Sequence, residues 1–431
     1  MIVANGMVYD SSQQEMILST LETRINETRM KAQLDPEIVI SAFDTLSRSI
    51  GNDDFPEFSE RIHTLHADDA IEHALRMFRR DCLEYKIKAE LGSRFFMPKL
   101  TGPPLGFPRV QIDPRPLGTL LHIAAGNMDI LPAYSVAEGL LTGNINILKL
   151  PSVDNGITVA LFELMLTIEP RLRDYVYIFD TPSDDIAAIR RMAAVADGIA
   201  VWGGEEAVSA VRRFAPTGCR LIEWGHRLGF AYISGYENKE QELTELAEHI
   251  MLTKQLLCSS CQVIYLDTSN MDEVADFCKT FLPYLERAAE KYPVEDVGAV
   301  AEMTLRRYSD MLECTLNPTK NMDGQVFQGK HCSLTASFDS ELELSYMYGN
   351  CIVKRLPEEQ MMNCLRRSKG YLQTAGLITT ASRRERLTEL LIRCGVNRVM
   401  RAGSMSDAFL GEAHDGEYAL RRYTRIVNVA L

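Results

Sequence analysis

The hydrophobic pattern divides the chain into a helical beginning followed by two alternating stretches. Apolar positions recur every three or four residues over 12–33, 36–49 and 68–92, which predicts amphipathic helices. Prolines then crowd residues 94–116. Because so many prolines exclude a helix, this segment is predicted to be an extended connector at a domain boundary.

Between 117 and 232, short apolar runs alternate with amphipathic segments. The apolar runs predict strands at 120–124, 146–150, 175–179, 198–202 and 230–234. Most of the intervening segments predict helices, at 130–142, 156–168, 184–195 and 205–214. This alternation indicates a parallel, doubly wound sheet with right-handed crossovers.

A long predicted helix at 237–256 leads to a second alternating stretch. Its predicted strands are 263–267, 334–338, 351–355, 372–380 and 396–400, and its predicted helices are 271–291, 357–368 and 383–394. The fold class is therefore α/β, with two doubly wound domains and a helical N-terminal region. The expected divisions are 1–105 for the helical region and connector, 106–235 and 236–405 for the two α/β domains, and 406–431 for a C-terminal segment.

Composition narrows the class of protein without changing this outline. The 431 residues are 46% hydrophobic and 24% charged, which is typical of a globular protein. A net charge of −13 argues against a nucleic-acid partner, which needs clustered lysine and arginine. No apolar run reaches the length of a membrane span, and the start lacks a secretory pattern. We therefore expect a cytoplasmic protein whose ten cysteines are reduced.

Residues 116–152 predict a strand, a loop, a helix and a second strand, an arrangement that binds nucleotides at the carboxyl edge of a sheet. Asn127 follows the first strand, where its amide can donate to an oxyanion or form a turn. Lys149 ends the second strand, where its ammonium can bind a ribose or phosphate or extend into solvent.

A glycine-rich phosphate loop, G-x-G-x-x-G, follows none of the predicted strands. Gly203 and Gly204 do separate a predicted strand from a helix, and they would let a pyrophosphate approach backbone N–H groups. An ordinary strand-to-helix turn is the simpler explanation of this pair. Glu223 follows a predicted strand of the same domain and is either a general base or a paired acid.

Cys258 lies where the predicted helix 237–256 gives way to a strand. A thiolate nucleophile needs a cation or N–H groups beside it, and Lys254 would lie one turn away if the helix continued. Cys258 and Cys261 also match C-x-x-C, but a zinc site needs further ligands, and redox motifs open a helix after a strand. A nucleophile, a buried structural cysteine and a thiol or metal ligand all remain open for Cys258, although no metal site is expected.

Three motifs, in this order, resemble the aldehyde dehydrogenase superfamily and, within it, the LuxC-like acyl-CoA reductase family. They are P-x-G-x-x-x-H-I-x-x-G-N at 116–127, G-L-L-x-x-N-x-x-I-x-K at 139–149 and Q-x-x-C-S-S at 255–260. The resemblance covers about residues 110–420 and implies an aldehyde-dehydrogenase-like fold. It makes 106–235 the NAD(P)-binding domain and 236–405 the catalytic domain.

The resemblance also implies a role for each catalytic candidate. Cys258 would accept the acyl group, and Asn127 would stabilise the oxyanion. Glu223 matches the superfamily glutamate, although the motif here reads E-W-G-H instead of E-x-G-G.

The expected cofactor contacts lie at three strand ends and are Ala125, Gly126, Lys149, Ser152, Gly203 and Gly204. Members of the superfamily commonly follow the lysine with Pro-Ser-Glu, whereas this chain continues Leu-Pro-Ser. Without that carboxylate, a phosphate on the ribose meets less repulsion. The cofactor is therefore expected to be NADPH, with NADH possible.

The function implied is NAD(P)H-dependent reduction of a fatty acyl-CoA or acyl-protein thioester to the aldehyde, through a thioester on Cys258. Alternatives are aldehyde oxidation, acyl-phosphate reduction, or a non-catalytic thiol- or metal-binding subunit. An acyl-protein synthetase is an expected partner. A homo-oligomer is also expected, with contacts through the N-terminal helices or the C-terminal segment, unless that segment returns to the cofactor domain.

Overall fold

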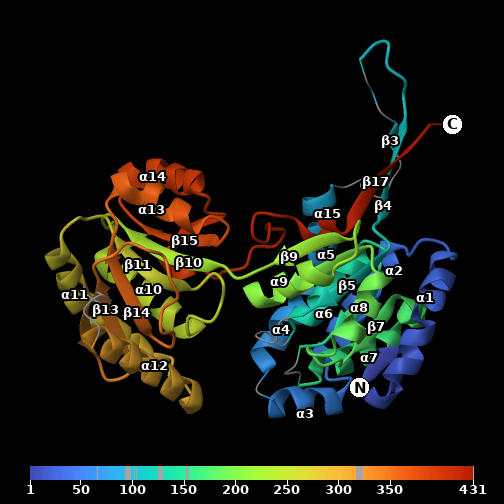
Figure 1. Cartoon of the computed structure of the whole chain (residues 1–431), viewed down its shortest axis with the longest axis horizontal. Helices are drawn as coiled ribbons and strands as arrows, with labels where there is room; N and C mark the ends of the chain where they lie inside the picture. The colour runs from blue at the N-terminus through green and yellow to red at the C-terminus, as the bar shows by residue number, and fades with distance from the viewer. Residues whose placement is uncertain are drawn as a thin grey trace. The chain divides into compact units, whose positions relative to one another are not determined.

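The computed structural model describes residues 1–65, 67–92, 99–100, 102, 104–124, 130–151, 155–316 and 324–430. The chain divides into two compact units, Met1–Gly225 with Phe409–Leu431, and His226–Ala408 (Figure 1). Each unit has its own large sheet and its own hydrophobic core. No helix within the described ranges is both long and apolar enough to cross a bilayer.

The first unit is built on a seven-stranded sheet with the order β2-β1-β7-β6-β5-β8-β9. Its parallel strands are β5 (Thr119–Ile123), β6 (Ile145–Lys149), β7 (Val176–Phe179), β8 (Gly198–Trp202) and β9 (Arg220–Trp224). A hairpin of β1 (Ile2–Ala4) and β2 (Met7–Tyr9) extends the sheet antiparallel to β7. Strand order reverses between β5 and β8, and open α/β sheets bind ligands beyond the carboxyl ends at such a point.

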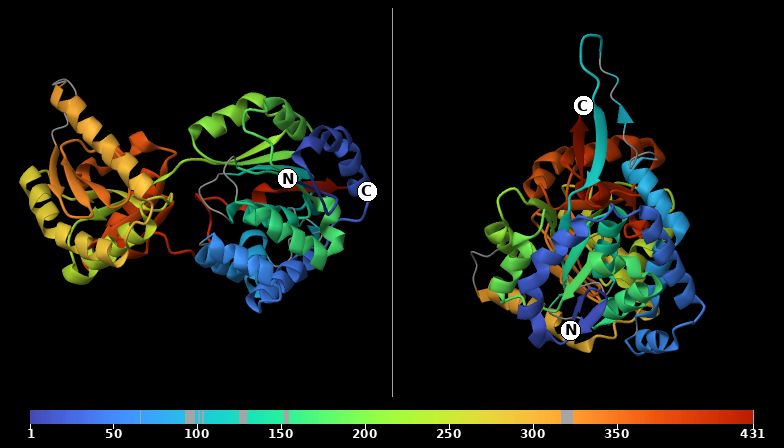
Figure 2. Two further views of the ribbon diagram at one scale, coloured as in Figure 1. Left: turned by 90° about the horizontal axis from the view of Figure 1, so that it is seen from below. Right: turned by 90° about the vertical axis from the view of Figure 1, so that its right-hand side faces the viewer.

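Helices cover both faces of this sheet (Figure 2). The crossover helices are α6 (Leu131–Leu141), α7 (Ile157–Ile168), α8 (Ile186–Ala194) and α9 (Glu205–Phe214). The N-terminal helices are α1 (Gln14–Arg29), α2 (Pro36–Gly51), α3 (Pro56–Thr64), α4 (Asp68–Met77) and α5 (Arg80–Leu91). Helix α2 packs on α6 and α7, so the helical beginning of the chain shares the core of this unit.

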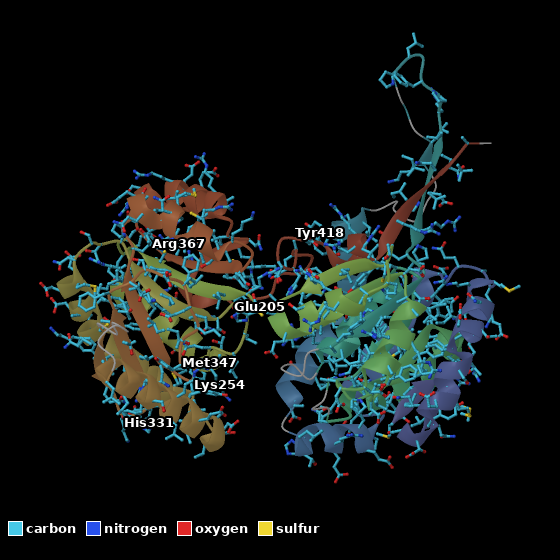
Figure 3. All side chains as sticks on the ribbon, viewed as in Figure 1. Glu205, Lys254, His331, Met347, Arg367 and Tyr418 are labelled. Carbon is cyan, nitrogen blue, oxygen red and sulfur yellow. The ribbon has the colours of Figure 1, made fainter. Side chains whose placement is uncertain are left out.

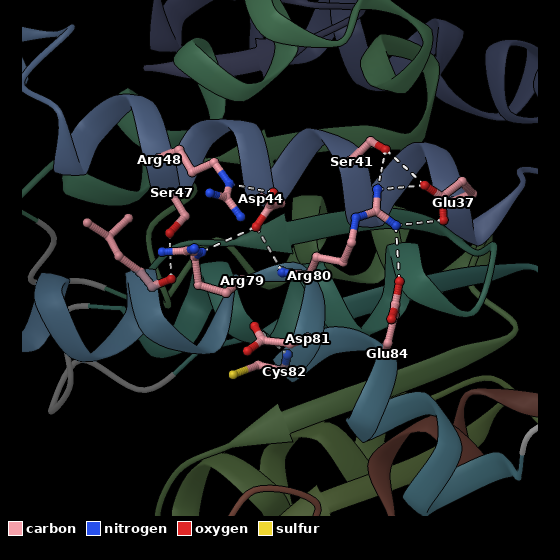
Figure 4. Close-up of polar contacts among 11 residues, drawn as sticks. Glu37, Ser41, Asp44, Ser47, Arg48, Arg79, Arg80, Asp81, Cys82 and Glu84 are labelled. Carbon is pink, nitrogen blue, oxygen red and sulfur yellow. Dashed lines mark hydrogen bonds and ion pairs between the residues drawn. The ribbon is translucent and has the colours of Figure 1, made fainter.

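Charged side chains join α2 to the start of α5 (Figure 4). The carboxylate of Asp44 accepts hydrogen bonds from Arg48 Nε at 2.8 Å and from the backbone N–H of Arg80 at 3.0 Å. The guanidinium of Arg80 donates to both oxygens of Glu37, at 2.6 and 2.9 Å. These arginines lower the pKa of both carboxyl groups. The network fixes two helices to each other.

A small sheet of order β17-β4-β3 completes the first unit. It consists of β3 (Lys99–Leu100), β4 (Gln111–Pro116) and, after the short helix α15 (Ala419–Arg422), β17 (Thr424–Val429). Both neighbours run antiparallel to β4. Within the described part of the proline-rich segment, β3 and β4 are therefore extended, as the sequence predicts, and the C-terminal strand pairs with β4.

The second unit has a seven-stranded sheet with the order β12-β13-β14-β11-β10-β15-β16. The strands are β10 (Leu228–Ile233), β11 (Cys261–Leu266), β12 (Gly324–Gln328), β13 (Ser333–Ser337), β14 (Asn350–Arg355), β15 (Leu372–Ile378) and β16 (Arg398–Arg401). All pairs are parallel except that of β12 with β13. The helices are α10 (Lys239–Thr253), α11 (Met271–Lys291), α12 (Val297–Leu316), α13 (Met361–Leu365) and α14 (Ala381–Cys394).

Residues of β10 alternate between the two apolar layers of this second sheet. Ala231 and Ile233 belong to the layer that includes α10 and α11, whereas Phe230 and Tyr232 belong to the layer beneath α14. Both faces of the strand are therefore buried, which explains why it reads as a continuous apolar run.

The structure differs from the sequence-based outline at three places. The strand predicted at 230–234 pairs with β11 and β15 of the second sheet, so it does not belong to the first α/β stretch, and the contacts divide the chain at Gly225 and not after 235. The helix predicted at 68–92 is two helices, because Arg79 leaves the helical conformation. The helix predicted at 357–368 is α-helical over Met361–Leu365 and forms 3-10 turns on either side.

Candidate active site

Cys258 and Cys261 are both reduced thiols, but their surroundings differ. Cys258 is half-buried in the loop between α10 and β11. Cys261 is the first residue of β11, is 1% exposed, and donates its thiol to the carbonyl of Val263 at 3.5 Å. Burial raises the pKa of Cys261 to about 12, which keeps this thiol protonated and inert. Of this pair, Cys258 has the exposure that a nucleophile requires.

The backbone leading to Cys258 makes an uncommon turn. Helix α10 ends at Thr253, and Lys254 and Gln255 then have φ angles of +51° and +60°. The helix predicted as far as 256 is therefore too long, and the expected one-turn spacing of Lys254 and Cys258 on a continuing helix is wrong. A loop distant in sequence stabilises this turn, because the backbone N–H of Tyr348 donates to the Lys254 carbonyl at 3.1 Å. Figure 3 shows Lys254 beside Met347 of that neighbouring loop.

A buried amide network fixes the same turn. Gln255, 1% exposed, donates from Nε2 to the Cys261 carbonyl at 2.9 Å and accepts at Oε1 from the N–H of Gly349 at 3.1 Å. Gln262 Nε2 donates to the Gln255 carbonyl at 2.8 Å, and its own oxygen accepts from the hydroxyl of Ser345 at 2.8 Å. Buried polar groups that are satisfied in this way hold one conformation. The left-handed turn before Cys258 is therefore supported by side chains from three segments.

Glycine at position 229 gives the Cys258 loop room to pack on β10. A Cβ atom at Gly229 would lie 2.5 Å from the Ser260 carbonyl oxygen and 2.8 Å from that of Ser259. The register of β10 also shifts after Gly229 against both neighbouring strands. Within the loop, the N–H of Leu257 donates to Ser260 Oγ at 3.1 Å. The thiol is thus presented at the amino edge of the second sheet.

Lys149 closes β6 in the first unit and is 3% exposed. Its ammonium donates to the hydroxyl of Ser183, which follows β7, at 2.7 Å. Burial lowers the pKa of Lys149. The alternative in which this lysine extends into solvent is therefore wrong, and its charge lies at the carboxyl edge of the sheet.

A cavity of about 640 Å³ lies at the carboxyl ends of β6 and β7, within the first unit. Leu150, Pro151 and Val159 supply apolar wall, while Arg61 and Ser183 supply polar groups. Small-molecule sites have volumes of about 300–1,000 Å³ and this mixed lining. Asp180 and Asp184 also line the cavity. These residues fit the adenosine half of a dinucleotide, with an apolar wall for the base and with one cation and two acids for the polar groups of its ribose.

Gly203 and Gly204 form the turn between β8 and α9. Gly204 is the N-cap residue of α9, and a Cβ atom there would have no neighbour within 4 Å, so open space lies before the helix. Glu205 and Glu206 occupy the first helical turn, and Figure 3 labels Glu205 at the start of α9. These acids favour the helix dipole but repel a pyrophosphate. A pyrophosphate therefore has room to approach the start of α9, but the two glutamates repel it.

Glu223 lies within β9 and not after it, opposite Val201 of β8. Its two carboxylate oxygens each accept a hydrogen bond from Arg212, at 2.6 Å from Nε and 2.6 Å from Nη2. This pairing stabilises the carboxylate and directs one lone pair of each oxygen toward the guanidinium. The structure therefore places Glu223 in a bidentate salt bridge.

His122, the histidine of the motif at 116–127, is buried and hydrogen-bonded within the first unit. His122 is fully buried between the hydroxyl of Ser135, 2.7 Å from Nδ1, and the amide oxygen of Asn146, 3.0 Å from Nε2. Burial lowers the pKa of His122 to about 4. His414, further along the chain, packs against the rings of Trp202 and Trp224 at centroid distances of 5.2 and 5.1 Å.

Four of the predicted site residues lie outside the described residues: Ala125, Gly126, Asn127 and Ser152. Among the residues that are described, no three His, Cys, Asp or Glu side chains gather as a metal site would require. The structure places the predicted residues in two groups, with Lys149, Gly203, Gly204 and Glu223 in the first unit and Cys258 in the second.

Sequence reasoning missed the groups around Lys149 and around Cys258. Ser183 follows the strand 175–179, and the expectation that functional groups gather at the carboxyl edge would have drawn attention to it. Arg61 reaches the cavity from α3, outside the α/β stretch, and no local signal marks it. Gln255 was visible as part of Q-x-x-C-S-S, but its buried partners come from long-range packing.

Comparison with known structures defines the class of protein. A glyceraldehyde-3-phosphate dehydrogenase from Methanocaldococcus jannaschii, solved in complex with NADP, superimposes with a TM-score of 0.74 at 12% identity and covers 98% of this chain and 95% of its own. A lactaldehyde dehydrogenase from Escherichia coli gives 0.69 at 13% identity, covering 98% and 92%. The chain therefore has the aldehyde dehydrogenase fold, which confirms the fold class predicted from the sequence.

The sequence defines the family more narrowly. The model of the acyl-CoA reductase (LuxC) family matches residues 33–426, and the chain belongs to this family. A long-chain acyl-protein thioester reductase from Photorhabdus luminescens is 24% identical over 349 residues, which are 79% of this chain and 69% of the relative. A second reductase of that name, from Photobacterium leiognathi, is 22% identical over 325 residues, 73% of this chain and 64% of the relative.

Proposed function

We propose that this protein reduces a fatty acyl thioester to the aldehyde with NADPH, through a thioester on Cys258. The observation that carries the proposal is the half-buried thiol of Cys258 on a loop fixed by Gln255, in a chain of the acyl-CoA reductase family. The relatives are named long-chain acyl-protein thioester reductases, which supports a long acyl group as substrate. The donor is an acyl-CoA or an acyl group carried on a protein.

The reaction proceeds in two stages on Cys258. Its thiolate attacks the carbonyl carbon of the donor and forms a new C–S bond. The bond from that carbon to the donor's sulfur breaks, and the donor leaves as a thiolate that takes a proton from water. NADPH, when bound, would supply the hydride that reduces the acyl carbon. The oxyanion then reforms a carbonyl as the bond to Cys258 breaks, which releases the aldehyde and regenerates the thiolate. Asn127 stabilises the oxyanion by donating from its side-chain amide.

NADPH is proposed over NADH because of the charges at the adenosine site. The sequence has Ser152 where the superfamily has the ribose-binding glutamate, and Lys149 lies buried at the adjoining strand end. Because Lys149 lies near the site and the glutamate is absent, the local charge favours a ribose that carries a phosphate. Ala125, Gly126, Gly203 and Gly204 complete the proposed contacts.

The reductive direction is favoured by the pairing of Glu223. Aldehyde oxidation needs a base that activates water on the thioester, whereas reduction needs no such water. Both oxygens of Glu223 are bound by Arg212. We propose that Glu223 shapes the site electrostatically in the reductive reaction.

Partners and location follow from the same chemistry. An acyl-protein synthetase would supply a protein-bound acyl thioester in the cytoplasm. We also propose a homo-oligomer, because the small β17-β4-β3 sheet and the adjoining loop expose apolar side chains, among them Leu100, Phe107 and Ile426.

Turnover assays test the proposed function. Purified protein mixed with fatty acyl-CoAs and NADPH is expected to oxidise NADPH and release aldehyde. Cys258→Ala should lower this rate by about a thousandfold or more. Cys82→Ala, at a half-buried cysteine of the other unit, should leave it unchanged. A full rate with Cys258→Ala would exclude the nucleophile, and formation of acid from aldehyde and NADP⁺ as the main reaction would favour oxidation.

A further inference from the structure

We infer that Arg61 binds the 2′-phosphate of the cofactor and thereby sets the preference for a phosphorylated dinucleotide. The inference rests on the proposed function, because it assigns a residue of the adenosine cavity to the proposed cofactor. Arg61 belongs to α3, a helix of the N-terminal region that lies outside the parallel α/β stretch. Its side chain nevertheless forms part of the wall of the cavity at the ends of β6 and β7.

The guanidinium of Arg61 is held at the start of α7. One Nη donates to the Asn155 carbonyl at 2.8 Å. A Cβ atom at Gly156, the N-cap residue of α7, would lie 2.2 Å from the same Nη. Glycine with φ +76° therefore leaves the space that the guanidinium fills. The arginine is positioned by the backbone it touches, and a planar group with five donors retains capacity for an oxyanion.

Charges of opposite sign line different parts of this cavity. Arg61 is at the start of α7, and Lys149, at the end of β6, lies behind the lining residue Ser183, to which it donates. The acids Asp180 and Asp184 are in the loop after β7. Asp180 already accepts from the hydroxyl of Ser11 at 2.6 Å and pairs with the amine of Met1, and Asp184 is exposed. A phosphate is therefore favoured on the side of α7, where Arg61 stands.

Arginine suits this role better than lysine does. Its fork can donate two parallel hydrogen bonds to one phosphate, which a lysine ammonium cannot do in the same geometry. Lys149 is already bound to Ser183 at 2.7 Å and supplies a point charge. Arg61 would supply the directional contacts that distinguish a 2′-phosphate from a 2′-hydroxyl.

Calorimetric titration with 2′,5′-ADP and with 5′-ADP tests the inference without turnover. The wild-type protein is expected to bind 2′,5′-ADP more tightly than 5′-ADP. Arg61→Gln should weaken the binding of 2′,5′-ADP by about 10- to 100-fold and that of 5′-ADP less than about twofold. Arg61→Lys should lose less than Arg61→Gln, because it keeps the charge. Arg213→Gln, at an exposed arginine near the end of α9, is the matched control and should change neither affinity.

Other outcomes separate the inference from the proposed function. Equal losses for both ligands, with a lower melting temperature, would show that Arg61 merely supports α7 and would overturn the inference. If Arg61→Gln leaves both affinities unchanged and Asp184→Asn weakens 5′-ADP binding, the acid recognises a ribose hydroxyl and the inference about Arg61 is overturned. That result would leave the proposed acylation of Cys258 intact. A wild-type protein that binds neither ligand would refute both the inference and the proposed cofactor.

Discussion

At the scale of single residues, burial decides what a side chain can do in this protein. Cys261 and Cys258 carry the same thiol, but enclosure in β11 raises the pKa of Cys261 to about 12, while Cys258 remains half-buried on its loop. Lys149 also loses solvent, and its pKa is lowered. Its ammonium donates to the hydroxyl of Ser183 at 2.7 Å, so its charge lies at the carboxyl edge of the sheet.

A second buried lysine, Lys86, stabilises the fold instead. Lys86 Nζ lies 2.5 Å from Glu90 and 2.9 Å from Glu138, and all three are nearly inaccessible. Glu90 also accepts from the N–H of Leu420 at 2.9 Å, which links α5 to the C-terminal segment. Two carboxyl groups share one ammonium, and burial raises the pKa of Glu138.

Lys86→Met is expected to destabilise the protein in a pH-dependent way. Removing one partner of a buried ion pair lowers the free energy of unfolding by about 3–5 kcal/mol. Burial raises the pKa of Glu138 above its unfolded value, and the charge of Lys86 opposes this rise. Without Lys86 the folded state therefore binds still more protons than the unfolded state above pH 4.5, and stability falls more steeply as pH rises. Urea unfolding should therefore show a larger loss at pH 8 than at pH 5.

The exposed pair Lys31 and Asp174 provides the control. Lys31→Met should change the free energy of unfolding little, because exposed ion pairs contribute little. An equal loss for Lys86→Met at both pH values would show that the buried carboxyl groups do not titrate with folding.

At the scale of elements, the junction of α10, β10 and β11 positions the thiol. The left-handed turn at Lys254 and Gln255 ends the helix, and the approach of β10 to the loop depends on Gly229. The conformation of the Cys258 loop therefore depends on a strand about 30 residues earlier in the sequence.

Gly229→Ala is expected to displace this loop. The added Cβ would meet two carbonyl oxygens at 2.5 and 2.8 Å, and overpacking of this kind costs about 1–3 kcal/mol. Both the melting temperature and the rate of Cys258 alkylation should change. Gly204→Ala, where a Cβ has no neighbour within 4 Å, should leave both unchanged. An unaltered alkylation rate in Gly229→Ala would mean that β10 does not support the loop.

Among the secondary-structure elements, the apolar pattern of the sequence predicts some strands well and misses others. The strands β5, β6, β7 and β8 were predicted within a residue or two because helices cover both faces and make each strand a continuous apolar run. The hairpin of β1 and β2 was not predicted, since its strands have three residues each. β10 was predicted as a strand but assigned to the wrong sheet, because pairing with β15 across 140 or so residues leaves no local pattern.

At the scale of the whole molecule, each unit carries a different part of the proposed chemistry. The first unit has Lys149 and the cavity lined by Arg61, and the second has the loop with Cys258. Motif spacing selects Cys258 and Lys149 as candidates from the sequence. It could not find Arg61, because the fold brings α3 to the end of α7 across about 95 residues.

The central claim is that Cys258 accepts the acyl group, and the mass of the intact protein tests it most directly. After incubation with fatty acyl-CoA in the absence of NADPH, the protein should gain the mass of one acyl group, and digestion should place it on the peptide containing Cys258. Addition of NADPH should remove that mass and release the aldehyde. Cys82→Ala should behave in the same way, and Cys258→Ala should gain no mass. Acylation of Cys258→Ala to the same extent, or persistence of the acyl group after NADPH is added, would contradict the claim.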